Sequence, residues 1–337
     1  MRALGQLLVI TIFSTGLATG PANHATAAEK RVAKPFGVRT TGGELAYEGT
    51  KRRRTAAALT PSLGSAVVKN VRTRKPPRAY TPHAGTTPSA EEDVARDEYG
   101  NAAGTDYDLA RDGAFSGKTV AVLQLYNGED EADSSGFDFA APAQALKEKG
   151  FKVRRWTSLP DPDTLEEGLR GTSQLWVISS GRGATLRSGH MQVIGSYFKR
   201  GRGLYLWGDN DPYTDEANQL GMELLESDGM LGNYHADQDL APAGTGLPNP
   251  GIQPHLVTTG LERLYEGITT ARIYGNLPPL LLGSDGHAVA SVYEQSGRRA
   301  IVDGGFTRLF YKWDTAGTAR YVKNAASWLA NAERFDR

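Results

Sequence analysis

The chain has 337 residues, which is enough for two ordinary domains or for one larger domain and an extended segment. Lys+Arg and Asp+Glu are equal at 38 each, so the overall charge gives no reason to expect nucleic acid as a partner. The sequence contains no cysteine, which excludes disulfide bonds, a cysteine nucleophile, a zinc-thiolate site and a cysteine-linked lipid anchor.

The N-terminal segment has the three parts of a secretory signal peptide. Arg2 precedes an apolar run from Leu4 to about Leu17, and the small-residue triplet Ala-Thr-Ala at 25–27 follows it. A single membrane anchor is the alternative, but the apolar run is shorter than the ~20 residues that a span needs. We therefore expect residues 1–28 to be cleaved, no transmembrane segment to remain, and the mature protein to be secreted or periplasmic.

The next segment, residues 29–117, is rich in Ala, Thr, Gly, Pro, Lys and Arg and holds no helical or strand period for long. Residues 29–80 contain thirteen Lys or Arg against three acids, whereas residues 81–116 contain two Arg against eight acids. We interpret the segment as a disordered arm that acts as a solvated linker. The alternative is that its basic part binds an anionic surface, such as cell-wall polymer or lipid headgroups.

From residue 118 the sequence alternates between strand and helix patterns. Apolar strands are predicted at 118–126, 151–159, 174–180 and 203–209, with helices at 138–150, 162–171 and 190–201 between them. A long irregular stretch at 228–256 is followed by strands expected at 269–275, 279–283, 287–295 and 298–305 and by a closing helix at 315–330. The pattern predicts a doubly wound, mostly parallel α/β sheet of the flavodoxin-like class, with an antiparallel extension near the C-terminus. We assign this domain to residues 118–334.

Ligands bind beyond the carboxyl ends of the strands in such a sheet, so the loops after Tyr126, Ser180, Asp209 and Asp303 are the candidate site. The loop "SSGRGATLRSGH" follows the third strand and supplies Arg182, whose guanidinium could hold an anion beside the glycine backbone, and also His190. The alternative interpretation is a tight turn and a solvated loop.

Acidic residues follow the fourth strand in "GDNDPYTDEAN". Asp211 before Pro212 is typical of a helix N-cap, and Asp215 and Glu216 would suit the first turn of that helix. Asp209 and Asn210 come before the predicted cap and have no such explanation. We predict no cofactor; the alternative is that carboxylates from several loops hold Ca²⁺ or Mg²⁺, although their spacing matches no EF-hand.

The usual hydrolase signatures are missing from the sequence. Only His190, His235 and His255 lie in plausible active loops, and none has HExxH spacing. Ser179 or Ser180 could serve a Ser-His-Asp triad, but no G-x-S-x-G elbow is present.

Several segments resemble one family. The loop "SSGRG", the strand and turn "LYLWGDNDPYTDEAN", the segment "PHLVTTGL" and the tail that ends in "NAASWLA" are similar to the class I glutamine amidotransferase-like superfamily, in its trehalose-utilisation-protein-like and related non-amidotransferase branch. The resemblance covers about residues 118 to 334. Amidotransferases of this superfamily have a catalytic cysteine at the turn after strand four and a late His-x-Glu pair. Here Asp209 and Asn210 are at that turn and the late pair is absent, so glutamine hydrolysis by that mechanism is not expected.

The resemblance implies a site location without implying a reaction. We predict an exported, non-catalytic domain that binds an unknown small molecule or protein through Arg182, His190, Asp209, Asn210 and Asp211. The alternative is an extracellular hydrolase of carbohydrate or amide bonds that uses an acid of this cluster, either as a metal ligand or as a general base.

Overall fold

The computed structural model describes residues 101–126, 137–181, 183, 185–310, 313 and 317–335, together with residue 96 and the backbone of two short strands near the N-terminus. The predicted signal peptide, the basic part of the arm except those two strands, and Arg182 lie outside the described residues. The chain divides into two units, residues 1–55 and 56–337. In the first unit, β1 (Val38–Thr41) and β2 (Glu44–Tyr47) form an antiparallel hairpin.

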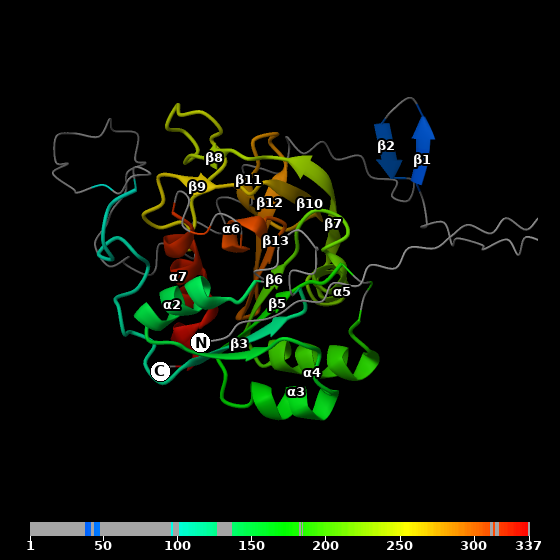
Figure 1. The fold of residues 1–337 in the computed structure, drawn as a ribbon, viewed down its shortest axis with the longest axis vertical. Coiled ribbons are helices and arrows are strands. Elements are labelled where there is room, and N and C mark those ends of the chain that lie inside the picture. Colours follow the sequence, from blue (N-terminus) through cyan, green and yellow to red (C-terminus); the bar gives the residue numbers. More distant parts are fainter. Residues whose placement is uncertain are drawn as a thin grey trace, which may run out of the picture. The chain divides into compact units, whose positions relative to one another are not determined.

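The second unit is built around a seven-stranded sheet of order β11-β12-β13-β6-β5-β3-β4 (Figure 1). Its parallel strands are β3 (Thr119–Gln124), β4 (Lys152–Trp156), β5 (Gln174–Ile178), β6 (Gly203–Trp207) and β13 (Arg298–Asp303). Antiparallel β12 (Ala288–Gln295) and β11 (Pro279–Leu282) extend the sheet beyond β13. The predicted flavodoxin-like α/β class and its antiparallel extension are therefore confirmed.

The helices cover both faces of this sheet because its central strands are apolar on both sides. Alternate residues of β3, β5 and β6 point to opposite faces, which divides the buried side chains into two cores. One core includes residues of α2 (Ala140–Glu148) and α7 (Thr318–Leu329). The other includes residues of α3 (Pro162–Leu169), α4 (Ser188–Lys199) and α5 (Asp215–Leu224).

The expectation of an irregular stretch at 228–256 is wrong at its start. Strand β7 (Ser227–His235) pairs antiparallel with β10 (Thr269–Gly275) in a separate two-stranded ribbon, so β10 is a strand as expected but does not join the central sheet. Gly229 and Gly232 adopt positive φ within β7 and interrupt its apolar alternation, which hid the strand from the sequence pattern. The other short elements are β8 (Asp239–Leu240), β9 (Leu264–Tyr265), α6 (Thr307–Phe310) and α8 (Ala332–Phe335).

Residues 101–117, which the sequence placed in the arm, pack against the α/β domain. The buried Asp108 carboxylate contacts three cations: Lys149 Nζ at 2.9 Å, Arg320 Nε at 2.8 Å and Lys323 Nζ at 3.2 Å. Asn101 Oδ1 also accepts hydrogen bonds from two backbone amides at 262 and 263. The domain therefore includes a segment before residue 118, and α2 and α7 are joined through it.

No helix among the described residues is both long and apolar enough to cross a bilayer.

Substituting Asp108→Asn should lower the free energy of unfolding by about 3 to 5 kcal/mol, because three cations would lose the buried anion that they share. Urea denaturation followed by tryptophan fluorescence measures this loss. Asp112→Asn is the matched control, since the Asp112 side chain is 47% exposed although it also contacts Lys149. The control should lose about 1 kcal/mol or less. Equal losses in the two variants would contradict the central role of Asp108.

Candidate functional site

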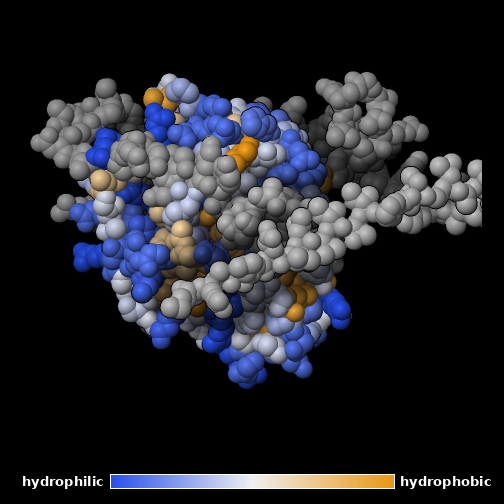
Figure 2. Space-filling view, viewed as in Figure 1, coloured by the Kyte–Doolittle hydropathy of each residue, from blue (hydrophilic) through white to orange (hydrophobic). Residues whose placement is uncertain are grey.

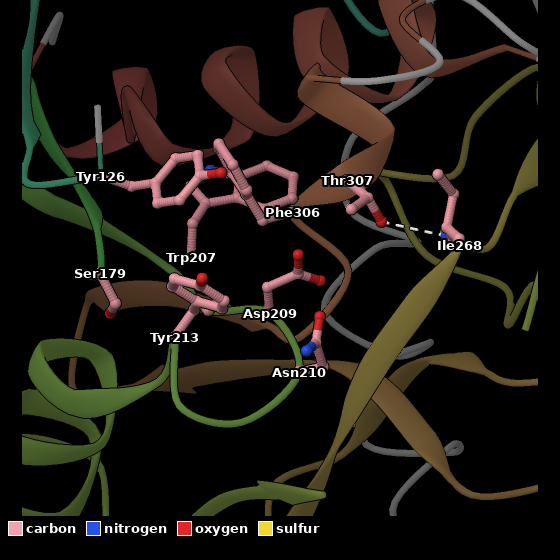
Figure 3. A pocket seen from close by; sticks show the side chains of 10 residues that line it. Tyr126, Ser179, Trp207, Asp209, Asn210, Tyr213, Ile268, Phe306 and Thr307 are labelled. Atoms are coloured by element: carbon pink, nitrogen blue, oxygen red, sulfur yellow. Dashed lines mark hydrogen bonds between the residues drawn. The ribbon is translucent and has the colours of Figure 1, made fainter. Parts of the chain in front are cut away.

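A cavity of about 240 Å³ lies at the carboxyl edge of the parallel strands (Figure 3). Its walls come from the segments that follow β3, β5, β6 and β13 and from the residue before β10, which is where the topology of the sheet predicts a ligand site. The lining residues are Tyr126, Ser179, Trp207, Gly208, Asp209, Asn210, Tyr213, Ile268, Phe306 and Thr307.

The Asp209 carboxyl is the chemically unusual group of this cavity. The turn that holds it is fixed by hydrogen bonds from Gly208 N to Asp303 O at 2.8 Å and from Asp209 N to Tyr213 O at 3.0 Å. Asp209 is only 6% exposed, and its Oδ1 has no hydrogen-bond partner among the described residues. Burial raises its pKa well above 3.8, although the backbone amide of Asn210 and the charge of Arg308 oppose the shift. Burial therefore favours the protonated form of a carboxyl that faces the cavity.

Aromatic rings form much of the cavity wall. The Tyr126 ring packs edge-on against Tyr213 at 5.3 Å and against Phe306 at 5.4 Å between ring centroids. Trp207, whose ring stacks on the core residue Tyr205, is fully buried, and its Nε1 has no hydrogen-bond partner among the described residues. The cavity thus combines apolar ring faces with two polar atoms, Asp209 Oδ1 and Trp207 Nε1, that have no partner in the described part of the chain.

Three further polar residues line the cavity. Ser179 Oγ accepts a hydrogen bond from Ala217 N at 2.8 Å, which leaves the hydroxyl hydrogen to donate elsewhere. Asn210 Nδ2 donates to Asn233 Oδ1 at 2.9 Å and so joins the rim to β7. Thr307 Oγ1 accepts from Ile268 N at 3.1 Å, as the dashed line in Figure 3 marks. These groups could bind a ligand with oxygen atoms.

A buried ion pair fixes the backbone beside Asp209. Arg308 Nη1 contacts both carboxylate oxygens of Asp303 at 2.6 Å, and both side chains are fully buried. The hydroxyls of Tyr205 and Tyr321 donate to Asp303 Oδ2 at 3.1 and 2.8 Å. The Arg308 guanidinium also donates to the carbonyls of residues 265 and 266. This network ties β13, α6, α7 and the segment after β9 together under the cavity.

The glycine loop after β5 is occupied by two carboxylates of the protein itself. Glu216, which is fully buried, accepts from Ser180 N at 2.8 Å and from Thr185 Oγ1 at 2.6 Å, and Asp215 Oδ2 accepts from Gly183 N at 2.8 Å. A Cβ at Gly181 would lie 2.7 Å from the ring of Tyr213, so this glycine lets the loop approach the cavity wall. The described amides that we expected to be open to a ligand anion therefore bind Glu216 and Asp215.

Glu216 is the residue that sequence reasoning missed. We expected it only to favour the helix N-terminus, and it does lie in the first turn of α5. Its position four residues before the buried Leu220 puts it on the inward face of the helix. That spacing is the signal that could have identified a buried acid.

Only some of the predicted site residues line the cavity. Asp209 and Asn210 line the cavity together, whereas Arg182 lies outside the described residues. His190 does not line the cavity: its Nδ1 accepts from Arg187 N at 3.1 Å at the start of α4, and its Nε2 lies 2.9 Å from Pro160 O. A histidine used on both sides in this way holds two segments together and adds nothing to the lining of this cavity.

Asp211 is not a helix N-cap. Helix α5 begins at Asp215 with Thr214 as its N-cap, and the Asp211–Pro212 peptide bond is cis. The Asp211 side chain accepts from Gly232 N at 3.0 Å, and its backbone N donates to Gly232 O at 3.1 Å. Asp211 therefore attaches the turn after β6 to β7 and does not line the cavity.

The structure gives no support to His255 as a catalytic residue or to a metal site among the described residues. His255 is buried against Trp328, and burial together with the charge of Arg299 lowers its pKa to about 3, so it is neutral. No group of three or more His, Asp or Glu in the described part of the chain could hold a metal ion. The Ca²⁺ or Mg²⁺ alternative thus has no support, and the acidic loop at 129–133 lies outside the described residues.

No protein-family model matches the chain, and no curated protein matches it. Among solved structures, it is similar to the mmIFT52 N-terminal domain, with 12% identity, a TM-score of 0.43 and coverage of 62% of this chain and 97% of that chain. A putative ThuA-like protein from Bacteroides uniformis has 14% identity and a TM-score of 0.41, with coverage of 64% and 91%. A second putative ThuA-like protein, from Parabacteroides merdae, has 12% identity and a TM-score of 0.40, with coverage of 64% and 90%. Similarity at this level assigns no activity.

Substituting Asp209→Asn should raise the free energy of unfolding at neutral pH. The raised pKa means that folding favours the protonated acid, so this group contributes its full stability below about pH 3.8 and loses it as the pH rises through the folded-state pKa. Asparagine is neutral at every pH and avoids that loss. Urea denaturation at a series of pH values should show the advantage of the variant widening from about pH 4 upward. A constant difference between the two proteins would contradict the burial of a titrating acid.

Substituting Glu216→Ala should lower the free energy of unfolding by on the order of 3 kcal/mol, because buried amide and hydroxyl donors would lose their acceptor. Chemical denaturation measures the loss. Glu223→Ala, on the exposed side of the same helix, is the control and should stay within about 0.5 kcal/mol of the wild type. A Glu216→Ala variant as stable as this control would show that the glycine loop does not need the carboxylate.

Proposed function

We propose that the domain binds a small uncharged molecule with a ring and several oxygen atoms, such as a sugar, in the cavity around Asp209. The observation that carries this proposal is the buried Asp209 carboxyl, whose Oδ1 has no partner among the described residues and which lies in the wall of an aromatic-lined cavity. Buried polar atoms are normally hydrogen-bonded, so one that remains unpartnered in a cavity wall is a candidate contact for a ligand.

The size and lining of the cavity support this class of ligand. Its volume of about 240 Å³ is slightly below the ~300 to 1,000 Å³ of sites for drug-sized molecules, which favours a ligand of about monosaccharide size. Aromatic rings suit the apolar face of such a ring, while Ser179, Asn210 and Thr307 offer polar contacts at its edge.

Binding of a small molecule is better supported than binding of a protein. On the face shown in Figure 2 most of the described surface is hydrophilic. The exposed large apolar residues that the structure describes are Met222, Leu247 and the pair Tyr234 and Tyr274, whose hydroxyl oxygens lie 3.2 Å apart. A protein interface usually offers a larger continuous apolar patch.

A hydrolase that uses Asp209 remains the second candidate. A carboxyl with a raised pKa suits a general acid. Glycoside hydrolysis usually needs a second carboxylate about 5 to 9.5 Å away. Among the described residues that line the cavity, Asp209 is the one acid, so we favour binding.

Two broader assignments also belong to this proposal. We infer that the chain is exported, on the strength of its signal-peptide pattern. We also infer that the domain belongs to the non-amidotransferase branch of the glutamine amidotransferase-like superfamily, on the strength of its sequence motifs and its strand order. N-terminal sequencing of the protein recovered from the medium or periplasm tests the first inference, with residue 28 or 29 as the expected start.

Ligand-observed NMR with a panel of uncharged mono- and disaccharides, followed by calorimetry on the compounds that bind, tests the function. Asp209→Ala should weaken binding by about tenfold or more, because it removes a buried hydrogen-bonding group from the wall. Asn210→Ala at the rim should weaken it by about threefold. Glu166→Ala, on the exposed side of α3, should bind like the wild type.

Unchanged affinity in both cavity variants would show that the ligand binds elsewhere, and no binding across the panel would refute the sugar proposal. Nitrophenyl glycosides are added as substrates in parallel. Release of nitrophenol by the wild type, lost in Asp209→Asn, would replace the binding proposal with the hydrolase.

A further inference from the structure

We propose that the cavity takes up its ligand only while the Asp209 carboxyl carries a proton, and that it rejects acidic ligands. The inference rests on the proposed function and specifies the chemical class of the ligand and the control of its binding. Three features of the structure support it: the charges that surround Asp209, the use of the nearby backbone amides, and the hydrogen-bonding capacity of a neutral acid.

The cation that acts on Asp209, Arg308, already binds another carboxylate, that of Asp303. The charged groups that act on Asp209 are Arg308 on α6 and Asp303 on β13. Arg308 binds both oxygens of Asp303 and the carbonyls of residues 265 and 266. Its charge still lowers the pKa of Asp209, but burial of the Asp209 carboxyl outweighs this effect. Asp303 in turn acts against a second negative charge on Asp209. No described residue that lines the cavity is a Lys or Arg.

Several backbone donors near the cavity are also used by the protein itself. At the N-terminus of α5, Ala217 N donates to Ser179 Oγ and Asn218 N donates to Thr214 O. In the glycine loop, the amides of residues 180, 183 and 185 donate to the carboxylates of Asp215 and Glu216. Among the described residues that line the cavity, a ligand carboxylate or phosphate would therefore find no Lys or Arg, and the Trp207 N–H alone would replace little of the water that it loses, which disfavours its binding in a buried site.

A protonated Asp209 offers what a neutral ligand needs. A carboxylic acid both donates and accepts a hydrogen bond, so it can pair with a hydroxyl group in either direction. A ligand seated over Oδ1 would also exclude water from the carboxyl and make its ionised form still less favourable. Because linkage is reciprocal, a ligand that favours the protonated acid is itself bound more tightly when the acid is protonated.

The chemistry of the ligand and its release follow from this linkage. The cavity should bind a neutral sugar and reject the corresponding uronic acid or sugar phosphate. Affinity should be highest in acidic solution, and the bound ligand should be released as the pH rises through the pKa of Asp209. Burial is the main reason why the pKa of Asp209 lies above its ordinary value. The ligand should therefore be released at a higher pH than it would be if the aspartate were exposed.

Calorimetry at a series of pH values, from acidic to mildly alkaline, tests the linkage between binding and protonation. The ligand is the neutral sugar that binds best in the panel, and the corresponding uronic acid is the comparison probe. Above the pKa of Asp209, wild-type affinity should fall by about tenfold per pH unit, and buffers of different ionisation enthalpy should show uptake of one proton on binding. Asp209→Asn, which mimics the neutral acid, should bind the sugar at every pH with an affinity within about threefold of the wild type at low pH. The uronic acid should bind at least tenfold more weakly.

Wild-type affinity that does not change with pH, or equal affinity for the sugar and the uronic acid, would overturn this inference while leaving the proposed function intact. An infrared difference spectrum of wild type minus Asp209→Asn decides the protonation of Asp209 without any ligand. A protonated carboxylic acid band at neutral pH supports the inference, and its absence overturns it even where no sugar binds.

Discussion

The site depends on the buried ion pair between Asp303 and Arg308. Burying two charges is costly unless their geometry is close and their other hydrogen bonds are made. Here Arg308 reaches both oxygens of Asp303, and the hydroxyls of Tyr205 and Tyr321 complete the acceptor side. The pair fixes the end of β13 and the start of α6, on which Phe306 and Thr307 stand. Its two charges act on Asp209 in opposite directions, since Arg308 lowers the pKa of Asp209 and Asp303 raises it.

Two buried acids of this domain, Glu216 and Asp209, have different roles because their surroundings differ in the hydrogen-bond donors that they offer. Glu216 is buried, but amide and hydroxyl donors surround it, so its carboxylate has the partners that a buried anion needs. Asp209 is buried with one oxygen unpartnered among the described residues, and burial raises its pKa, which favours the neutral form. The same residue class therefore stabilises a loop at one position and faces a cavity at another. Sequence position alone could not have distinguished them.

The fold could be predicted from the sequence because it follows from apolar patterning. The strands β3, β5 and β6 are continuous apolar runs, and their helices have clear ends, so the parallel sheet was identifiable. The sequence also pointed to the end of β6, and Asp209 and Asn210 line the cavity there. Both conclusions needed only local sequence and the general rule for ligand sites in parallel sheets.

What could not be predicted depended on contacts between distant segments. His190 was expected near the ligand, but its ring binds a carbonyl thirty positions earlier in the chain. Asp211 was expected to begin a helix, but it bonds to Gly232 in a strand that glycines had hidden. The aromatic wall combines Tyr126, Tyr213 and Phe306 from three different strand ends. Such tertiary pairings leave no local periodicity in the sequence.

The anchoring of Asp108 also sets the order in which the domain can be completed. This aspartate precedes the first strand of the sheet, yet its partner Arg320 is 212 positions later, on the last long helix. Any process that handles the chain from its N-terminus to its C-terminus, such as synthesis or threading through a membrane pore, therefore reaches α7 after every strand of the sheet. Until then Asp108 lacks Arg320 and Lys323, and one face of the sheet lacks α7. The domain can close only once α7 has emerged.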